Sequence, residues 1–178
     1  MTIPELLTTM AILAFVVTGI LVVFVGGLNA TTGMNARFRA QQNARLALSS
    51  LRYEVGFACS VPAYTQQNVT LWLPDPTTQA CSGSTNYVAW CADSASGAPY
   101  ALYRQTGTTS PVPCSASTGV KRASSLQSNA VFPTYTCTGT TRAQLGVSLL
   151  VNANFATSSI PYKLTDTITL RNATIGVC

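Results

Sequence analysis

The first part of the chain is apolar almost without interruption. Residues 3–28 contain one charged side chain, Glu5, and no lysine or arginine precedes Arg37. At about 1.5 Å of rise per residue, an α-helix of this length could span a bilayer with some tilt. A cleavable secretory signal would instead carry basic residues ahead of its apolar core. The pattern therefore favours a long apolar helix over a signal peptide.

The pattern changes near residues 29–33, where polar side chains replace the apolar run. Beyond them, a stripe recurs at steps of three and four residues, which indicates an amphipathic helix with one face on a core. The stripe consists of Phe38, Gln41, Ala44, Leu48, Leu51 and Val55. We expect one continuous helix to about Gly56. The alternative, a membrane anchor followed by a separate helix, would break at Gly33.

Residues 57–178 follow a third pattern, with short apolar or alternating runs between proline-containing loops. Such runs predict β-strands. The expected strands are Val69–Leu73, Tyr87–Cys91, Ala101–Arg104, Gln144–Val151 and Thr165–Arg171. An antiparallel sheet packed on the second half of the helix would bury both apolar faces. The predicted class is α+β, divided into residues 1–28, 29–56 and 57–178, with the apolar half of the helix protruding from the head domain.

The cysteines all lie outside the apolar segment. They are Cys59, Cys81, Cys91, Cys114, Cys137 and Cys178. An even number in a loop-rich, polar region predicts disulfide bonds formed in an oxidising, extracytoplasmic space. The alternative, a zinc site, lacks both a CxxC pair and a histidine. Closing the shortest local loops favours Cys81–Cys91 and Cys114–Cys137, which leaves Cys59–Cys178.

Charged residues make up only 8% of the chain, and histidine is absent. A histidine-based catalytic triad and histidine-type metal ligation are therefore excluded. Asp75, Asp93 and Asp166 are isolated in sequence, so only spatial convergence could make a carboxylate pair or a calcium site of them. The net charge of +5 is spread along the chain, and a nucleic-acid patch would likewise need the fold to assemble it. We expect no enzyme, cofactor or metal centre.

Glu5 stands near one end of the apolar segment, where a carboxylate is costly in a membrane. A local explanation exists, because residues 2–5 form a T-x-x-E capping box with Thr2 as N-cap. Glu5 would also lie at the positive end of the helix dipole. Capping, however, does not require apolar surroundings, so a second role for Glu5 is expected.

The opening Thr-Ile-Pro-Glu-Leu-Leu at residues 2–7, with the apolar run to Leu28, resembles the mature N-terminus of type IV pilins and pseudopilins. The resemblance covers residues 1–56 and implies the pilin fold. It implies that a prepilin peptidase removes a leader before Met1, whose amine is then methylated. It also implies that Glu5 pairs with the Met1 amine of a neighbouring subunit. Pro4 departs from the aliphatic residue usual there, so the start of the helix would differ.

For the filament itself, the resemblance implies a major pilin that forms a homopolymer through its apolar helices. The subunit would sit in the cytoplasmic membrane, be assembled by inner-membrane machinery, and become part of an extracellular filament. The helix would stretch or melt locally within Thr18–Leu28 on packing. Adhesion, twitching motility or DNA uptake would then follow from polymerisation.

Two other functions remain open at this point. One is a minor pilin or pseudopilin of a type II secretion or competence machine, because residues 41–55 are similar to a segment of some minor pilins. The other is a membrane-anchored exported domain, a binding protein or an enzyme, that never polymerises. Loss of filaments after replacement of Glu5 would distinguish a subunit from an anchored monomer.

Overall fold

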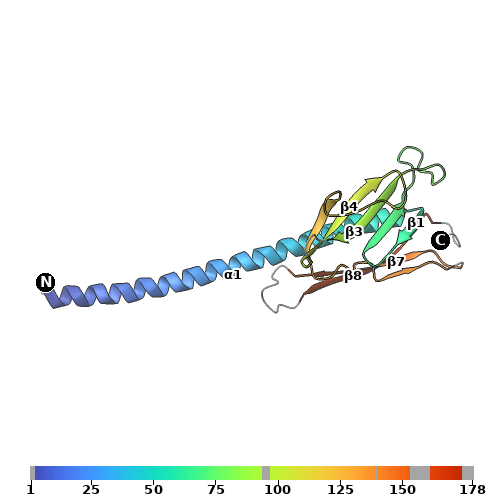
Figure 1. The fold of residues 1–178 in the computed structure, drawn as a ribbon. Coiled ribbons are helices and arrows are strands. Elements are labelled where there is room, and N and C mark those ends of the chain that lie inside the picture. Colours follow the sequence, from blue (N-terminus) through green and yellow to red (C-terminus); the bar gives the residue numbers. More distant parts are fainter. Residues whose placement is uncertain (1–2, 94–96, 139, 153–160, 174–178) are drawn as a thin grey trace. The chain divides into compact units, whose positions relative to one another are not determined.

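The computed structural model describes residues 3–93, 97–138, 140–152 and 161–173. The chain divides into two compact units, residues 1–38 and residues 39–178. One helix, α1 (Ile3–Phe57), continues from the first unit into the second (Figure 1). The predicted end of the helix near Gly56 is confirmed, and the alternative break at Gly33 does not occur.

One face of the second half of α1 is buried. The buried residues are Ala40, Ala44, Ala47, Leu48, Leu51 and Val55, spaced by one to four positions. The predicted stripe is confirmed from Ala44 onward, but it is wrong at Phe38, whose side chain is 60% exposed. The reason is that burial against the core begins only at Ala40, two residues later than the apolar spacing suggests.

The described residues that follow α1 form an eight-stranded antiparallel sheet with its connecting loops. Its strands are β1 (Ser60–Tyr64), β2 (Asn68–Trp72), β3 (Tyr87–Asp93), β4 (Tyr100–Gly107), β5 (Val120–Leu126), β6 (Thr134–Thr136), β7 (Gln144–Val151) and β8 (Tyr162–Thr169). All five predicted strands are present. The last begins and ends earlier than expected, and β1, β5 and β6 were not predicted.

Strands β1 to β5 pair in chain order, each with the next. β5 then meets β7 at a single register pair, Leu126 with Val151. β8 pairs with the whole length of β7, whereas β6 pairs with only its first residues. Figure 1 shows the consequence: β3 and β4 lie in one part of the curled sheet, and β7 and β8 lie in another. The predicted α+β layout with an antiparallel sheet is thus present.

The core fills the space between the buried face of α1 and the inner face of the sheet. Alternation in β3 points Val88 and Trp90 inward, and both side chains are essentially buried. Phe132, which lies between β5 and β6, completes the core beside β7. The outer face of β3 and β4 carries a second, smaller apolar cluster, formed by Cys91, Ala101 and Tyr103 with half-buried Cys114.

The disulfide pairing differs from the predicted one. Cys59 is bonded to Cys81, and Cys91 is bonded to Cys114. These bonds contradict all three predicted pairs, Cys81–Cys91, Cys114–Cys137 and Cys59–Cys178. The physical reason is the extension of β3: from Tyr87 to Cys91 the strand rises about 13 Å, which carries Cys91 away from the turn that holds Cys81. Cys137 is also disulfide-bonded, and Cys178 lies outside the described residues.

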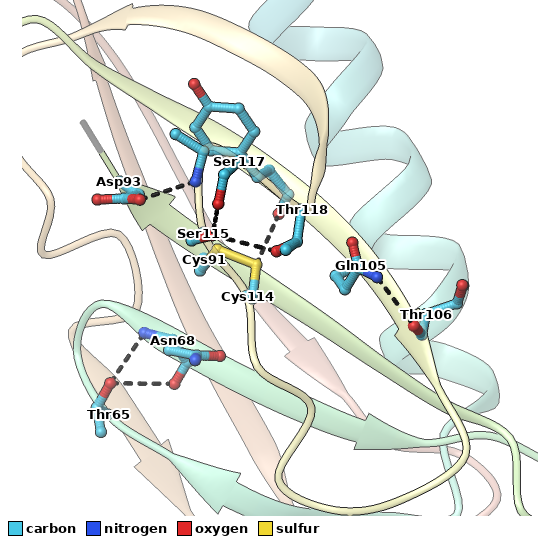
Figure 2. Close-up of a disulfide and its surroundings, with 12 residues drawn as sticks. Thr65, Asn68, Cys91, Asp93, Gln105, Thr106, Cys114, Ser115, Ser117 and Thr118 are labelled. Atoms are coloured by element: carbon cyan, nitrogen blue, oxygen red, sulfur yellow. Dashed lines mark hydrogen bonds between the residues drawn. A yellow bond between two sulfur atoms is a disulfide. The ribbon is translucent and has the colours of Figure 1, made fainter. Parts of the chain in front are cut away.

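The Cys91–Cys114 bond holds the segment between β4 and β5 on the outer face of the sheet (Figure 2). The backbone N–H of Ala116 donates to Asp93 Oδ2 at 2.8 Å. The hydroxyl of Ser115 lies 2.8 Å from that of Ser117 and 3.1 Å from that of Thr118. A covalent bond and short-range hydrogen bonds therefore fix a segment that has few large apolar side chains.

Gly119 sits where this segment returns to the sheet, and its replacement by alanine should destabilise the fold by about 1–3 kcal/mol. A Cβ atom there would lie 2.7 Å from Tyr103 Cβ and 3.0 Å from the Ser115 carbonyl oxygen. Gly56→Ala is the control, because a Cβ there meets no atom within 4 Å and alanine favours the helix. Urea unfolding of the full chain followed by tryptophan fluorescence measures both, and equal stability of the two variants would contradict the expectation.

Candidate functional site

The apolar half of α1 is exposed along its whole described length. From Ile3 to Leu28 every side chain is solvent-accessible, including large ones such as Phe15 and Val23. The mean hydropathy reaches 2.7 over an 18-residue window, and no part of that window is buried. The helix is therefore long and apolar enough to cross a membrane. An apolar surface of this extent needs a lipid or protein environment to leave water.

The threonine hydroxyl groups of α1 are hydrogen-bonded within the helix. Hydroxyls donate to backbone carbonyls three or four residues earlier, as in Thr8 to Glu5 at 3.0 Å and Thr18 to Ala14 at 2.8 Å. Thr9, Thr31 and Thr32 make the same kind of bond. Because each donor is satisfied within the helix, threonine adds little polar surface to the exterior. The helix thus stays compatible with apolar surroundings despite its threonines.

Glu5 lies in the first turn of α1, at the end of the apolar surface. Its carboxylate is thereby placed near the positive end of the helix dipole, as the sequence predicts. Met1 and Thr2 lie outside the described residues, so the N-cap role of Thr2 and the pairing of the Met1 amine stay predictions.

A partly buried ion pair joins the second half of α1 to the sheet. Arg104 of β4 donates from Nε to Glu54 Oε1 at 2.7 Å, and the side chains are 23% and 13% exposed. Trp90 of β3 donates from Nε1 to Glu54 Oε2 at 2.6 Å. Trp90 and Arg104 are register partners, so one carboxylate fixes the helix to two neighbouring strands. Because both Glu54 oxygens already accept hydrogen bonds from the sheet, this contact stabilises the packing of the helix on the sheet.

Replacing Glu54 with glutamine should lower the free energy of unfolding by about 1–2 kcal/mol. The amide oxygen can still accept from Trp90, but the charge that holds the Arg104 guanidinium is lost. Asp166→Asn is the matched control, because its pair with Arg52 is more exposed and should change stability by less than about 1 kcal/mol. Urea unfolding of both variants is the measurement, and equal losses would contradict a special role for the Glu54 contact.

The edge strand β8 and the residues just after it contact α1 at three positions along the helix. The strand runs parallel to the helix (Figure 1). Arg45 donates to the Tyr162 hydroxyl at 2.7 Å and lies over its ring. Arg52 pairs with Asp166. Just beyond β8, the Arg171 N–H donates to the Gly56 carbonyl and Asn172 Nδ2 donates to the Phe57 carbonyl. Carbonyls that a helix end leaves without partners are thereby satisfied.

The isolated aspartates take separate local roles. Asp166 pairs with Arg52, and Asp93 accepts from the Ala116 N–H. Asp75 Oδ1 accepts from the backbone N–H groups of Thr77 and Thr78, and these bonds lower the pKa of the Asp75 carboxyl. Within the described part of the chain, no three His, Cys, Asp or Glu residues gather in a way that could hold a metal ion.

The chain thus has an apolar helix with one acid in its first turn. The charged side chains of the head described above make ion pairs and hydrogen bonds that stabilise the fold. No protein-family model, curated protein or solved structure matches the chain.

Sequence reasoning missed the contact of Glu54 with Arg104 and Trp90. One signal pointed to it. In a chain with so few acids, Glu54 falls between the buried positions Leu51 and Val55, close to the core. Its partners could not be found in the same way, because they depend on the register of β3 with β4.

Proposed function

We propose that this protein is a structural subunit of an extracellular filament of the type IV pilus class, held together by its apolar N-terminal helix. The observation that carries the proposal is the exposed apolar surface of residues 3–28, which contains one acid, Glu5, in the first helical turn. A membrane would cover this surface before assembly, and the helices of neighbouring subunits would cover it afterwards.

Glu5 gives the proposal its specificity. In a bundle of such helices, its carboxylate would pair with the Met1 amine of a neighbouring subunit. Desolvation offsets much of the Coulomb attraction, so the value of the pair lies in fixing the axial position of each subunit. A simple membrane anchor has no such need for an acid near its end.

The disulfide-bonded head domain supports the same proposal, because such a domain is suited to an extracellular space. Disulfides compensate for a modest core in an oxidising space, and neutral polar side chains replace most surface charges. The second half of α1 belongs to the core of this head. Force applied to the helix would therefore be carried directly into the sheet.

The test is to shear the surface fraction from the source cells, image it by electron microscopy, and identify its main chain by mass spectrometry. Thin uniform filaments composed mainly of this protein are expected. If the chain stays in the membrane and no such filaments form, the major-subunit function is wrong. A minor pilin should then appear as a trace component of filaments built from another chain, and an anchored monomer should appear in none.

A further inference from the structure

A small hollow opens where α1 ends. Its cavity volume is about 270 Å³, and its apolar wall is formed by Tyr53, Phe57, Leu73, Pro74 and Pro76. The rings of Tyr53 and Phe57 lie 4.7 Å apart, centre to centre. Tyr53 is 67% exposed although it lies beside the core face of the helix. We call this site the aromatic hollow.

The aromatic hollow is anionic in a basic protein. Asp75 and Glu54 belong to its wall, and none of the described residues lining it is a lysine or an arginine. Glu54 is already neutralised by Arg104. Asp75 uses Oδ1 for its own turn, while Oδ2 makes no hydrogen bond within the described residues. One carboxylate oxygen beside two aromatic rings is thus available to a cation.

The turn that presents Asp75 is fixed in place. The Gln79 N–H donates to the Asp75 carbonyl, and the Asp75 N–H donates to the Ala80 carbonyl. The next residue, Cys81, is bonded to Cys59 just after the end of α1. The Asp75 carboxylate is therefore held against the helix end before any partner arrives, which lowers the entropic cost of binding.

Two exposed cations lie at the other end of the head. Arg39 is the first residue of the second unit, and Lys163 follows Tyr162, which contacts Arg45. Both side chains are exposed, and neither pairs with an acid among the described residues. From the helical rise, residues 39–45 lie about 12–27 Å along the axis from the aromatic hollow. We call Arg39 and Lys163 the cationic end.

We propose that the aromatic hollow of one subunit receives Lys163 from the cationic end of a second copy of this chain. The methylene stem of the lysine would lie on the rings of Tyr53 and Phe57, and its ammonium group would reach Asp75 Oδ2. Because the two surfaces lie at opposite ends of the head, the contact is head-to-tail and can repeat without closing. The inference rests on the proposed filament function and assigns a second contact to it, outside the apolar helices.

The direct test is cross-linking of assembled filaments with a carbodiimide, which joins a carboxylate to an amine in contact with it. Filaments assembled from equal amounts of ¹⁵N-labelled and unlabelled chains distinguish links between copies from links within one. We expect an Asp75–Lys163 link with mixed labels, identified by mass spectrometry. Filaments without that link would overturn the contact alone. Absence of filaments would overturn the proposed function and the contact with it.

Variants give an independent measure. Asp75→Asn keeps an oxygen for the turn and removes the charge, so the head should fold normally while the filament yield falls about tenfold. The filament yield should fall further in the Asp75→Lys variant. Adding Lys163→Asp to that variant should restore the yield. Lys121→Glu is the matched control, because it reverses an exposed cation of β5 that belongs to neither surface. Unchanged yield in Asp75→Asn, or no recovery in the charge-swapped pair, would overturn the proposal.

Discussion

Filaments should be almost completely lost when Glu5 is replaced by glutamine. Glutamine has nearly the same shape and prefers the helix equally well, but it cannot neutralise the Met1 ammonium group of a neighbouring subunit. A buried charge left without its partner weakens an association by at least about a hundredfold. The measurement is the filament yield in the sheared fraction, compared with the amount of subunit in the membrane.

Two controls separate this role from damage to the helix. Glu5→Asp keeps the charge and should retain part of the yield. Thr9→Val removes a hydroxyl that is already bonded within the helix, to the Leu6 carbonyl, and should assemble normally. Normal yield from Glu5→Gln would show that the acid does not set the position of the subunits. Its place in the first turn would then be explained by the capping box and the helix dipole.

The second large effect should follow removal of the Cys59–Cys81 bond. The double variant Cys59→Ser, Cys81→Ser should lose about 3 kcal/mol of unfolding free energy, since a loop of 22 residues is no longer closed in the unfolded chain. Thermal unfolding of the oxidised chain measures the loss. The same variant should also lower filament yield, because the turn that carries Asp75 is released from the helix end.

The other bond provides a matched comparison. Cys91–Cys114 closes a loop of 23 residues, so chain entropy alone predicts nearly the same loss for the two double variants. The Cys91→Ser, Cys114→Ser variant frees the segment around Cys114 on the outer face of the sheet, but it leaves the Cys59–Cys81 bond that holds the Asp75 turn. It should therefore lose stability but keep its filament yield. Equal yields from the two variants would show that the Asp75 turn has no part in assembly.

The helix could be predicted well because its signals are local. Apolar spacing of three and four residues located the buried face from Ala44 to Val55, and Gly56 marked its end within one residue. Phe38 was misassigned because periodicity does not reveal where a neighbouring sheet begins. The strands with continuous apolar or alternating runs, β3 and β7 above all, were found for the same local reason.

The missed features depend on contacts between distant parts of the chain. β5 begins with Val120, Lys121 and Arg122, all exposed, so its sequence has little strand pattern. β6 has three residues and exists only beside β7. The disulfide pairs follow the extension of β3 and the return of the segment before β5, neither of which shows in cysteine spacing. The ion pair of Glu54 depends on register in the same way.

The bonds between the end of α1 and residues 171–172 also determine when the head can fold. Asn172 is separated from Phe57 by 115 positions, so the end of α1 gains this partner only after all eight strands have been synthesised. Until β8 and residues 171–172 are in place, the edge of β7 is open and the final helical carbonyls lack these partners. The head can therefore complete its fold only when residues 162–172 are present. A chain interrupted before β8 would present the open edge of β7, and an unpaired strand edge of this kind promotes aggregation.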